Sequence, residues 1–191
     1  EATLTVRKLA NNYAEITSGS AHFKIVGMAP EEYPKLPREE SAPLVKVPGA
    51  TLLEMIRKTS FAISSDETRY VLNGVFFEPR EGGKVRMVAT DGHRLARVEI
   101  PAPQGSVGMP GVIVPRKAVI EVRKLIEETE GDITISLSDA KIKFAFDNVS
   151  LTSKLIDGTF PDYERVIPTG NDKVLEAERQ ALFDAVDRVS A

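Results

Sequence analysis

The sequence predicts an α+β protein built from a repeated unit, in which one helix is followed by several antiparallel strands. Two observations carry this prediction. A short strand of the pattern Val-x-Val-Pro leads into an amphipathic helix at Val45 and again at Val112. Alternating apolar and polar residues, typical of strands with one buried face, fill most of the chain around these helices. Each helix has one apolar stripe and each sheet one apolar face, so each must cover the other.

The chain begins with a predicted set of three strands, at residues 3–6, 13–16 and 22–26. Asn11-Asn12 and residues 18–20 supply the turns between them. No start signal precedes the first strand, which suggests a sheet entered midway. Residues 28–41 are rich in Pro and charge and predict an extended connector, because Pro cannot donate to a strand ladder.

The first helix is predicted to begin after Pro48, a residue that suits the first turn of a helix. Apolar residues recur at helical spacing and predict one buried stripe, formed by Leu52, Met55, Ile56, Thr59 and Ile63. The opposite side carries charge, at Glu54, Arg57 and Lys58.

Strands are predicted again at residues 70–78, 84–88 and 97–100, with turns at residues 81–83 and at Asp91-Gly92. Residues 101–111 predict a flexible connector. The second helix follows Pro115, and its predicted buried stripe is Val119, Val122, Leu125 and Ile126. Further strands are expected at 132–138, 141–146 and 150–155, and a third helix at 173–191 with Leu182, Val186 and Val189 on one side.

These elements form an internal repeat. The strand set of residues 3–27 matches that of residues 133–158, and Tyr33-Pro34 matches Phe160-Pro161. We therefore expect one unit used twice per domain. The predicted division is the second half of a first domain at residues 1–43, a complete middle domain at 44–168, and the first helix of a third domain at 169–191.

The composition excludes several classes of protein. The chain has 191 residues, no Cys and a net charge of −3, so neither a disulfide framework nor a Cys-based metal site is available. No apolar run is long enough to span a membrane and no secretion signal is evident, so a cytoplasmic location is expected. An acidic total argues against tight, indiscriminate binding of nucleic acid, although it permits a local basic surface.

Catalytic motifs are missing from the sequence. It contains two histidines, His22 and His93, on segments expected in different domains, and neither metalloprotease nor phosphate-loop spacing. His93-Arg94-Leu95 lacks the Asp that a kinase catalytic loop requires. Asp91 beside His93 could form a dyad, so a hydrolase using this pair remains an alternative. We expect no metal and no cofactor.

Five segments carry a resemblance to a known family. They are residues 69–74 (Arg-Tyr-Val-Leu-Asn-Gly), 89–96 (Ala-Thr-Asp-Gly-His-Arg-Leu-Ala), 112–117 (Val-Ile-Val-Pro-Arg-Lys), 152–158 (Thr-Ser-Lys-Leu-Ile-Asp-Gly) and 160–168 (Phe-Pro-Asp-Tyr-Glu-Arg-Val-Ile-Pro). In order and spacing they resemble the bacterial DNA polymerase III beta subunit, the sliding clamp. This resemblance implies the DNA-clamp fold, a pseudo-symmetric arc of helix-plus-sheet units with helices lining one side and sheets on the outside.

The resemblance also implies a function without catalysis. A sliding clamp encircles double-stranded DNA, independently of its sequence, as a head-to-tail homodimer in the nucleoid. It is a processivity factor that tethers the DNA polymerase III alpha subunit, the clamp loader and other replication and repair proteins. The runner-up function is a peptide-binding adaptor that uses a sheet edge and is unrelated to DNA.

Two sets of site residues follow from the resemblance. The peptide-binding groove of the middle domain corresponds to Leu72, Thr90, Gly92, His93, Arg94, Leu95, Pro161, Arg165 and Val166. The residues expected to face DNA are Arg57, Lys58, Arg69, Tyr70, Arg116, Lys117, Arg123 and Lys124. Acidic neighbours dilute the second set, and a weak contact is what a ring that slides requires.

Overall fold

The computed structural model describes residues 3–33, 44–128 and 130–190, and the chain divides into two compact units, Glu1–Ser41 and Ala42–Ala191. The first unit is a three-stranded antiparallel sheet in the order β1-β2-β3, with β1 at Thr5–Lys8, β2 at Tyr13–Ser18 and β3 at Ala21–Val26. Between β1 and β2, Asn11 and Asn12 adopt positive φ, which Asn tolerates better than most residues. β1 begins two residues later than the strand predicted at residues 3–6. Residues 34–43 of the predicted connector lie outside the described residues.

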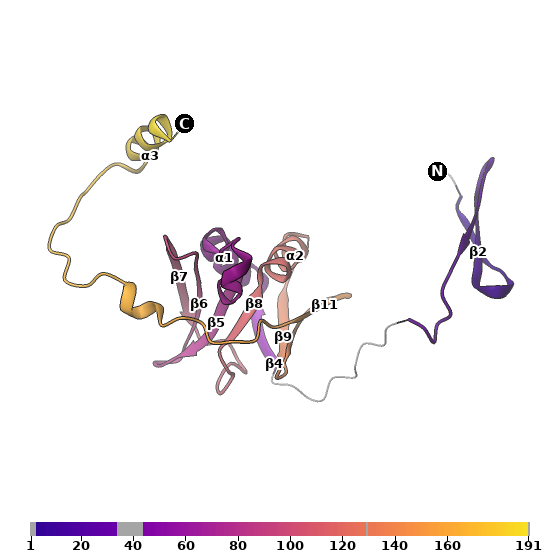
Figure 1. Cartoon of the computed structure of the whole chain (residues 1–191), viewed down its shortest axis with the longest axis horizontal. Helices are drawn as coiled ribbons and strands as arrows, with labels where there is room; N and C mark the ends of the chain where they lie inside the picture. The colour runs from indigo at the N-terminus through magenta and orange to yellow at the C-terminus, as the bar shows by residue number, and fades with distance from the viewer. Residues whose placement is uncertain (1–2, 34–43, 129, 191) are drawn as a thin grey trace. The chain divides into compact units, whose positions relative to one another are not determined.

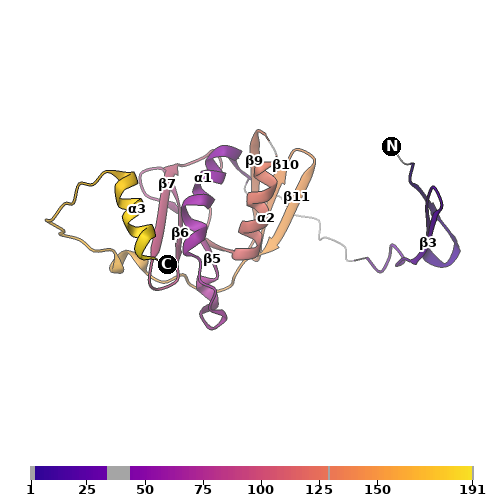
Figure 2. The same cartoon turned by 90° about the horizontal axis from the view of Figure 1, so that it is seen from above.

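The second unit contains two four-stranded antiparallel sheets and two long helices that cover them on one side (Figures 1 and 2). In chain order, its first elements are β4 (Leu44–Pro48), α1 (Gly49–Thr59), β5 (Gly74–Arg80), β6 (Lys84–Thr90), β7 (Leu95–Pro101) and β8 (Val112–Pro115). They continue with α2 (Arg116–Glu127), β9 (Asp132–Leu137), β10 (Lys141–Phe146), β11 (Val149–Lys154) and α3 (Arg179–Val189). The predicted α+β class with helices on one side is confirmed.

The two half-units of this domain exchange their first strands. The sheet orders are β11-β10-β9-β4 and β7-β6-β5-β8. β4 therefore precedes α1 in sequence but pairs with β9 of the second half, with Val47 opposite Ile133. In the same way β8 precedes α2 but pairs with β5 of the first half, with Val114 opposite Val75. Neither half can complete its sheet without the other.

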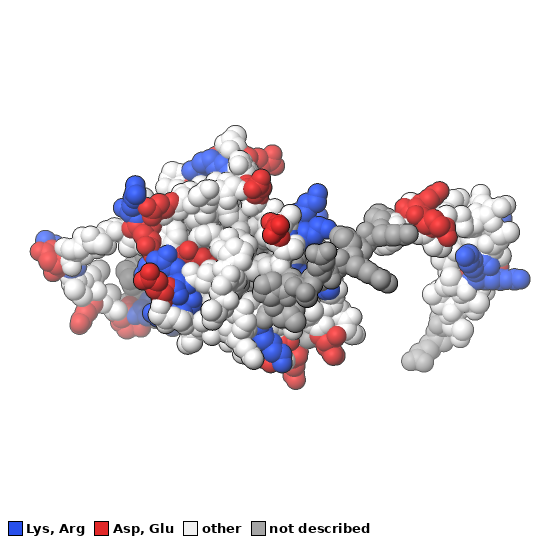
Figure 3. Space-filling view, turned by 90° about the horizontal axis from the view of Figure 1, so that it is seen from below, with Lys and Arg blue, Asp and Glu red and all other residues white. Residues whose placement is uncertain are grey.

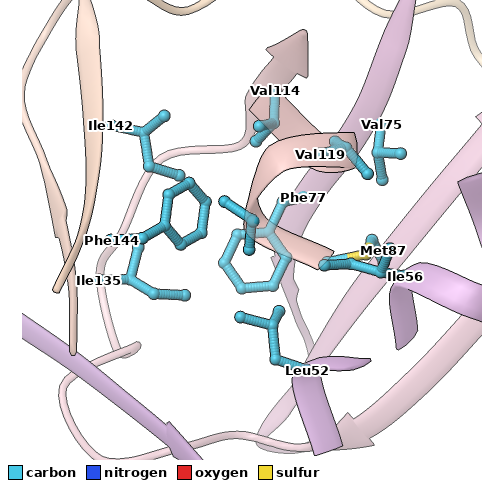
Figure 4. Close-up of a pocket in the computed structure, with 11 residues that line it drawn as sticks. Leu52, Ile56, Val75, Phe77, Met87, Val114, Val119, Ile135, Ile142 and Phe144 are labelled. Atoms are coloured by element: carbon cyan, nitrogen blue, oxygen red, sulfur yellow. The ribbon is translucent and has the colours of Figure 1, made fainter. Parts of the chain in front are cut away.

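The main core lies between the helices and the inner faces of both sheets. Leu52 and Ile56 of α1 and Val119 and Val122 of α2 meet Phe77 from one sheet, with Ile135, Ile142 and Phe144 from the other (Figure 4). The void among these side chains is only about 20 Å³, so this is a packed core and not a ligand site. The predicted helix stripes are buried here, except that Leu125 is only partly buried and Ile63 lies beyond the end of α1.

A second, smaller core lies on the outer face of the sheet β7-β6-β5-β8. Side chains along β6 alternate: Val85, Met87 and Ala89 belong to the main core, whereas Val88 packs in the second. The other members of the second core are Leu72, Ile113, Phe160 and Tyr163. The ring of Phe160 stacks on that of Phe76, with centroids 4.9 Å apart. The segment that follows β11 thus crosses back over this sheet and covers it.

Two predicted elements are corrected. Residues 70–78 were expected to be a single strand, but the structure has a 3-10 helix, η3 (Glu67–Leu72), before β5 begins at Gly74. The Asp66 carboxylate caps η3 by accepting from the backbone N–H of Thr68, a local interaction that competes with strand formation. The third helix, expected at 173–191, begins only at Arg179, where the Glu178 side chain accepts from the N–H groups of Gln180 and Ala181. The apolar side of α3, including Leu182 and Val186, is exposed.

Within the described ranges, the structure contains no helix that is both long enough and apolar enough to cross a membrane.

The exchange of strands predicts where the domain is sensitive to mutation. Val47 of β4 is 1% exposed, whereas Val107, in the loop before β8, is 91% exposed. Val47→Ala removes two buried methyl groups and leaves a cavity between the halves, so we expect the free energy of unfolding to fall by about 2 kcal/mol. Urea denaturation followed by circular dichroism measures it. The matched change Val107→Ala should stay within about 0.5 kcal/mol of the unsubstituted chain. Equal values for the two variants would show that β4 is not part of the core.

Candidate functional site

An open groove of about 620 Å³ lies on the outer side of the sheet, next to the turn that joins β6 to β7. Three segments form it: the end of η3, the β6–β7 turn, and the segment with the short 3-10 helix η4 (Tyr163–Val166). The lining residues are Leu72, Thr90, Gly92, His93, Arg94, Leu95, Pro161, Asp162, Tyr163, Val166, Ile167 and Pro168. Segments far apart in the sequence therefore build one surface.

The β6–β7 turn is fixed by its own side chains. The Asp91 carboxylate accepts from the backbone N–H groups of His93 and Arg94, at 2.9 and 3.0 Å, and from the Arg94 guanidinium at 3.0 Å. The Thr90 hydroxyl donates to the Arg94 carbonyl at 2.8 Å. The two backbone donors, followed by the Arg94 side chain, lower the pKa of Asp91 to about 2. Gly92 has φ +89, a conformation that glycine adopts without strain.

This geometry argues against the hydrolase alternative. The Asp91 carboxylate is engaged by the backbone of the turn and by Arg94, and no hydrogen bond joins it to the His93 imidazole in the described structure. With a pKa near 2, Asp91 is also a weak base. Among the described residues no group of three or more His, Cys, Asp or Glu side chains could hold a metal ion.

The groove offers apolar surface that is open to solvent among the described residues. Leu72 is buried in its floor and Leu95 is partly buried, whereas Val166 is 71% exposed. The cations nearby are neutralised: Arg94 pairs with Asp91 at 3.0 Å, and Arg165 with Asp162 at 2.6 Å. A largely apolar surface of this size with a few polar groups at its edge suits a short peptide with aliphatic or aromatic side chains.

The structure brings together all the predicted groove residues except one. Arg165 belongs to η4, but its side chain is 84% exposed and does not line the groove. The prediction omitted Asp162, Tyr163, Ile167 and Pro168, which do line it. All four lie in the motif at 160–168, so the signal was present in the sequence. Only the backbone path of η4 decides which of its side chains point inward.

Six residues predicted to face DNA lie on α1 and α2, and all six are exposed. Most of their charges are paired with carboxylates of these two helices, either within a helix or between them. Arg57 reaches from α1 to Glu127 of α2 at 2.7 Å, and Arg123 reaches the same carboxylate at 3.3 Å. Lys58 pairs with Glu54 and Lys124 with Glu121. Arg116 and Lys117, at the start of α2, have no carboxylate partner among the described residues.

Arg69 and Tyr70 lie elsewhere, on η3 beside the groove. Arg69 pairs with Asp66 at 3.1 Å, and a Cβ placed on Gly92 would lie 2.7 Å from the Arg69 guanidinium. Tyr70 is 57% exposed, and its hydroxyl lies close to Gly158. Arg69 is thus next to the turn that lines the groove, whereas Tyr70 lies against the segment that follows β11. On the face turned away from the helices, basic and acidic side chains are interspersed (Figure 3).

Comparison with known proteins gives a consistent result. Residues 46–162 match the family model of the DNA polymerase III beta subunit, central domain. The beta sliding clamp of Caulobacter vibrioides is 45% identical over 178 residues, which cover 92% of this chain and 48% of that protein. The beta sliding clamp of Pseudomonas aeruginosa is 37% identical over 175 residues, with 92% and 47% covered. The chain spans about half the length of these relatives.

Solved structures agree. The DnaN sliding clamp of Bartonella birtlesii bound to griselimycin has a TM-score of 0.93 and 45% identity, covering 99% of this chain and 51% of that one. The DNA polymerase III subunit beta of Pseudomonas aeruginosa has a TM-score of 0.88 and 34% identity, with 98% and 51% covered. The sequence motifs, the exchanged strands and these matches together show that the chain belongs to the family of the DNA polymerase III beta subunit, the bacterial beta sliding clamp.

Proposed function

We propose that this chain is the peptide-binding part of a sliding clamp, a processivity factor that encircles DNA and tethers replication proteins to it. The observation that carries the proposal is the groove, because three segments of the chain build it and its apolar wall is open to solvent, with Val166 71% exposed. A preformed apolar groove with a rigid turn at its edge loses little entropy when it binds a peptide. The activity proposed is binding, without catalysis.

The proposed partners follow from family membership. They are the DNA polymerase III alpha subunit, the clamp loader and other proteins that carry a clamp-binding motif, in the cytoplasm at the nucleoid. In the whole protein we propose a head-to-tail dimer around DNA. The proposed domains of this chain remain 1–43, 44–168 and 169–191, and the matched family model, at 46–162, falls inside the middle one.

Griselimycin is a suitable probe of the groove. The Bartonella birtlesii clamp, 45% identical to this chain, was solved bound to it. We propose that the same compound binds this chain at the groove formed by η3, the β6–β7 turn and η4. Bound there, the compound would cover the apolar surface that Leu95 and Val166 contribute to the groove.

The helices α1 and α2 are the proposed DNA-facing side. Their exposed cations are largely paired with Glu54, Glu121 and Glu127, so the positive potential is weak. Such a surface attracts the phosphate backbone without reading bases and without holding the DNA in one place. Arg116 and Lys117 carry most of the unpaired charge on this side.

The groove assignment is tested at Val166. Val166→Asp places a charge on the exposed apolar wall, so griselimycin should bind at least about tenfold more weakly, as for a residue at the centre of an interface. Isothermal titration calorimetry measures the dissociation constant. Val107→Asp, a matched change at a site 91% exposed and outside the groove, should bind normally. Normal binding by Val166→Asp would place the compound elsewhere.

The DNA-facing side is tested by reversing charge at the start of α2. In the Arg116→Glu, Lys117→Glu variant, binding of a labelled DNA duplex at low salt should weaken, and the slope of log K against log salt should fall by about two. Fluorescence anisotropy measures both. Because the two sites are exposed, the free energy of unfolding should change by less than about 0.5 kcal/mol.

The matched control reverses a pair of lysines on the sheet. Lys141 and Lys154 lie opposite each other on β10 and β11. The Lys141→Glu, Lys154→Glu variant has the same net charge as the α2 variant. If both variants bind duplex DNA equally weakly, net charge alone controls binding and the assignment of the helices is wrong.

A further inference from the structure

Arg86 of β6 is a buried charge that lies outside the groove. Arg86 is 7% exposed, and it is the only charged residue that is buried in the described part of the chain. Val88 and Thr90 follow it on the same face of β6, and Thr90 lines the groove. A buried arginine is costly unless it is fully paired, so its partners show what it holds in place.

Two of those partners are on the neighbouring strands. The register places Glu78 of β5 and Glu99 of β7 directly opposite Arg86, one on each side. The Arg86 Nε donates to Glu99 at 2.6 Å. These contacts fix the guanidinium above the sheet, in a row that runs across three strands.

The other partners are on η4, far along the chain. The Nη1 of Arg86 donates to the Tyr163 hydroxyl and to the Glu164 carboxylate, the latter at 2.5 Å. The Tyr163 hydroxyl in turn donates to Glu78 at 2.5 Å. We call Glu78, Arg86, Glu99, Tyr163 and Glu164 the Arg86 cluster. It ties η4 to the sheet, with Arg86 at its centre.

The same helix η4 forms a wall of the groove. Tyr163 and Val166 line it, and Ile167 follows directly. Arg86 does not line it. We propose that Arg86 is a positioning residue for the peptide groove, which holds η4 in the binding geometry through Tyr163 and Glu164. This inference rests on the proposed function of the groove.

Electrostatics supports the geometry. Burial opposes the charge on Arg86, but the hydrogen bonds that it donates to Glu164, Tyr163 and Glu99 outweigh it and raise the pKa of its guanidinium. The hydrogen bond from Arg86 likewise lowers the pKa of Glu164 and of Glu99. Arg86, Glu99 and Glu164 therefore stay charged at neutral pH, and the hydrogen bonds among them persist there.

η4 is also held by two contacts that do not involve Arg86. Arg80 of β5 pairs with Glu164 at 2.7 Å. Phe160 and Tyr163 pack into the second core, and this apolar contact does not need Arg86. Loss of Arg86 should therefore leave the domain folded while η4 undocks part of the time. If η4 were docked in only about a tenth of the molecules, the apparent dissociation constant would rise about tenfold.

The test measures griselimycin binding by calorimetry in the full chain, with four variants. Arg86→Met should raise the dissociation constant about tenfold, and Arg86→Lys should rescue part of the loss, because lysine keeps the charge but cannot bridge several acceptors. Glu164→Gln, at a side chain 45% exposed and outside the groove, weakens the pairs with both Arg86 and Arg80 and should weaken binding in the same direction. Lys84→Met is the matched control. Lys84 also pairs with Glu99 from β6 but does not reach η4, so this variant should bind normally.

Two readouts separate positioning from a general loss of stability. Hydrogen exchange in Arg86→Met should accelerate at residues 160–168 and stay slow in β5 and β6. In a Val166→Ala background, where a wall contact is already absent, Arg86→Met should cost less than in the native chain. Uniform acceleration of exchange, or strictly additive losses, would mean that Arg86 serves stability alone.

Failure of this assignment differs from failure of the proposed groove. Normal griselimycin binding by both Arg86→Met and Glu164→Gln, with Val166→Asp still defective, would overturn the role of Arg86 and leave the groove intact. If the unsubstituted chain does not bind griselimycin, the groove itself is overturned, and the role of Arg86 with it.

Discussion

The outer face of the sheet β7-β6-β5-β8 must be covered, and much of the structure follows from that requirement. Val88 of β6 is 0% exposed although the main core lies on the other face of its sheet. A strand with apolar side chains on both faces needs a layer on each side. The helices supply one layer, and the segment of residues 156–168 supplies the other. The groove exists because that second layer ends where the β6–β7 turn begins.

The covering segment carries charge as well as apolar surface. Phe160 stacks on Phe76, while Tyr163 and Glu164 meet the buried Arg86. Apolar packing is tolerant of small shifts, whereas hydrogen bonds to a buried guanidinium require one orientation. The apolar part therefore attaches the segment, and the Arg86 cluster sets its orientation. A groove that binds a short peptide depends on that orientation, since its wall is made of few side chains.

The exchange of β4 and β8 links the two halves of this arrangement. Each half of the middle domain completes the sheet of the other half, so the two helices and two sheets are expected to fold together. Arg57 of α1 also bridges to Glu127 of α2 across the two halves. The charged helix side and the groove thus belong to one folded domain. In a clamp, such a connection would keep the DNA side and the partner side in a fixed relation.

The sequence by itself determined the repeat, the helix stripes and most of the groove. Val-x-Val-Pro before each helix and the stripe from Leu52 to Thr59 are local patterns, and the structure buries them as predicted. The motif segments also placed Leu72, Thr90, Leu95 and Val166 on one groove, because resemblance to a family carries tertiary information that a single pattern lacks.

Three further features were seen only in the structure, two of them because they depend on tertiary contacts. Strand exchange could not be predicted from periodicity, because a strand has the same pattern whichever sheet it joins. η3 replaced the expected start of β5, since the side chain of Asp66 satisfies the backbone of a tight turn at a place where the apolar pattern favours a strand. In the sequence, Arg86 is a polar residue in an alternating strand pattern, which predicts an exposed side chain. Its burial and its role depend on Tyr163 and Glu164, which the chain brings to it only after crossing back over the sheet.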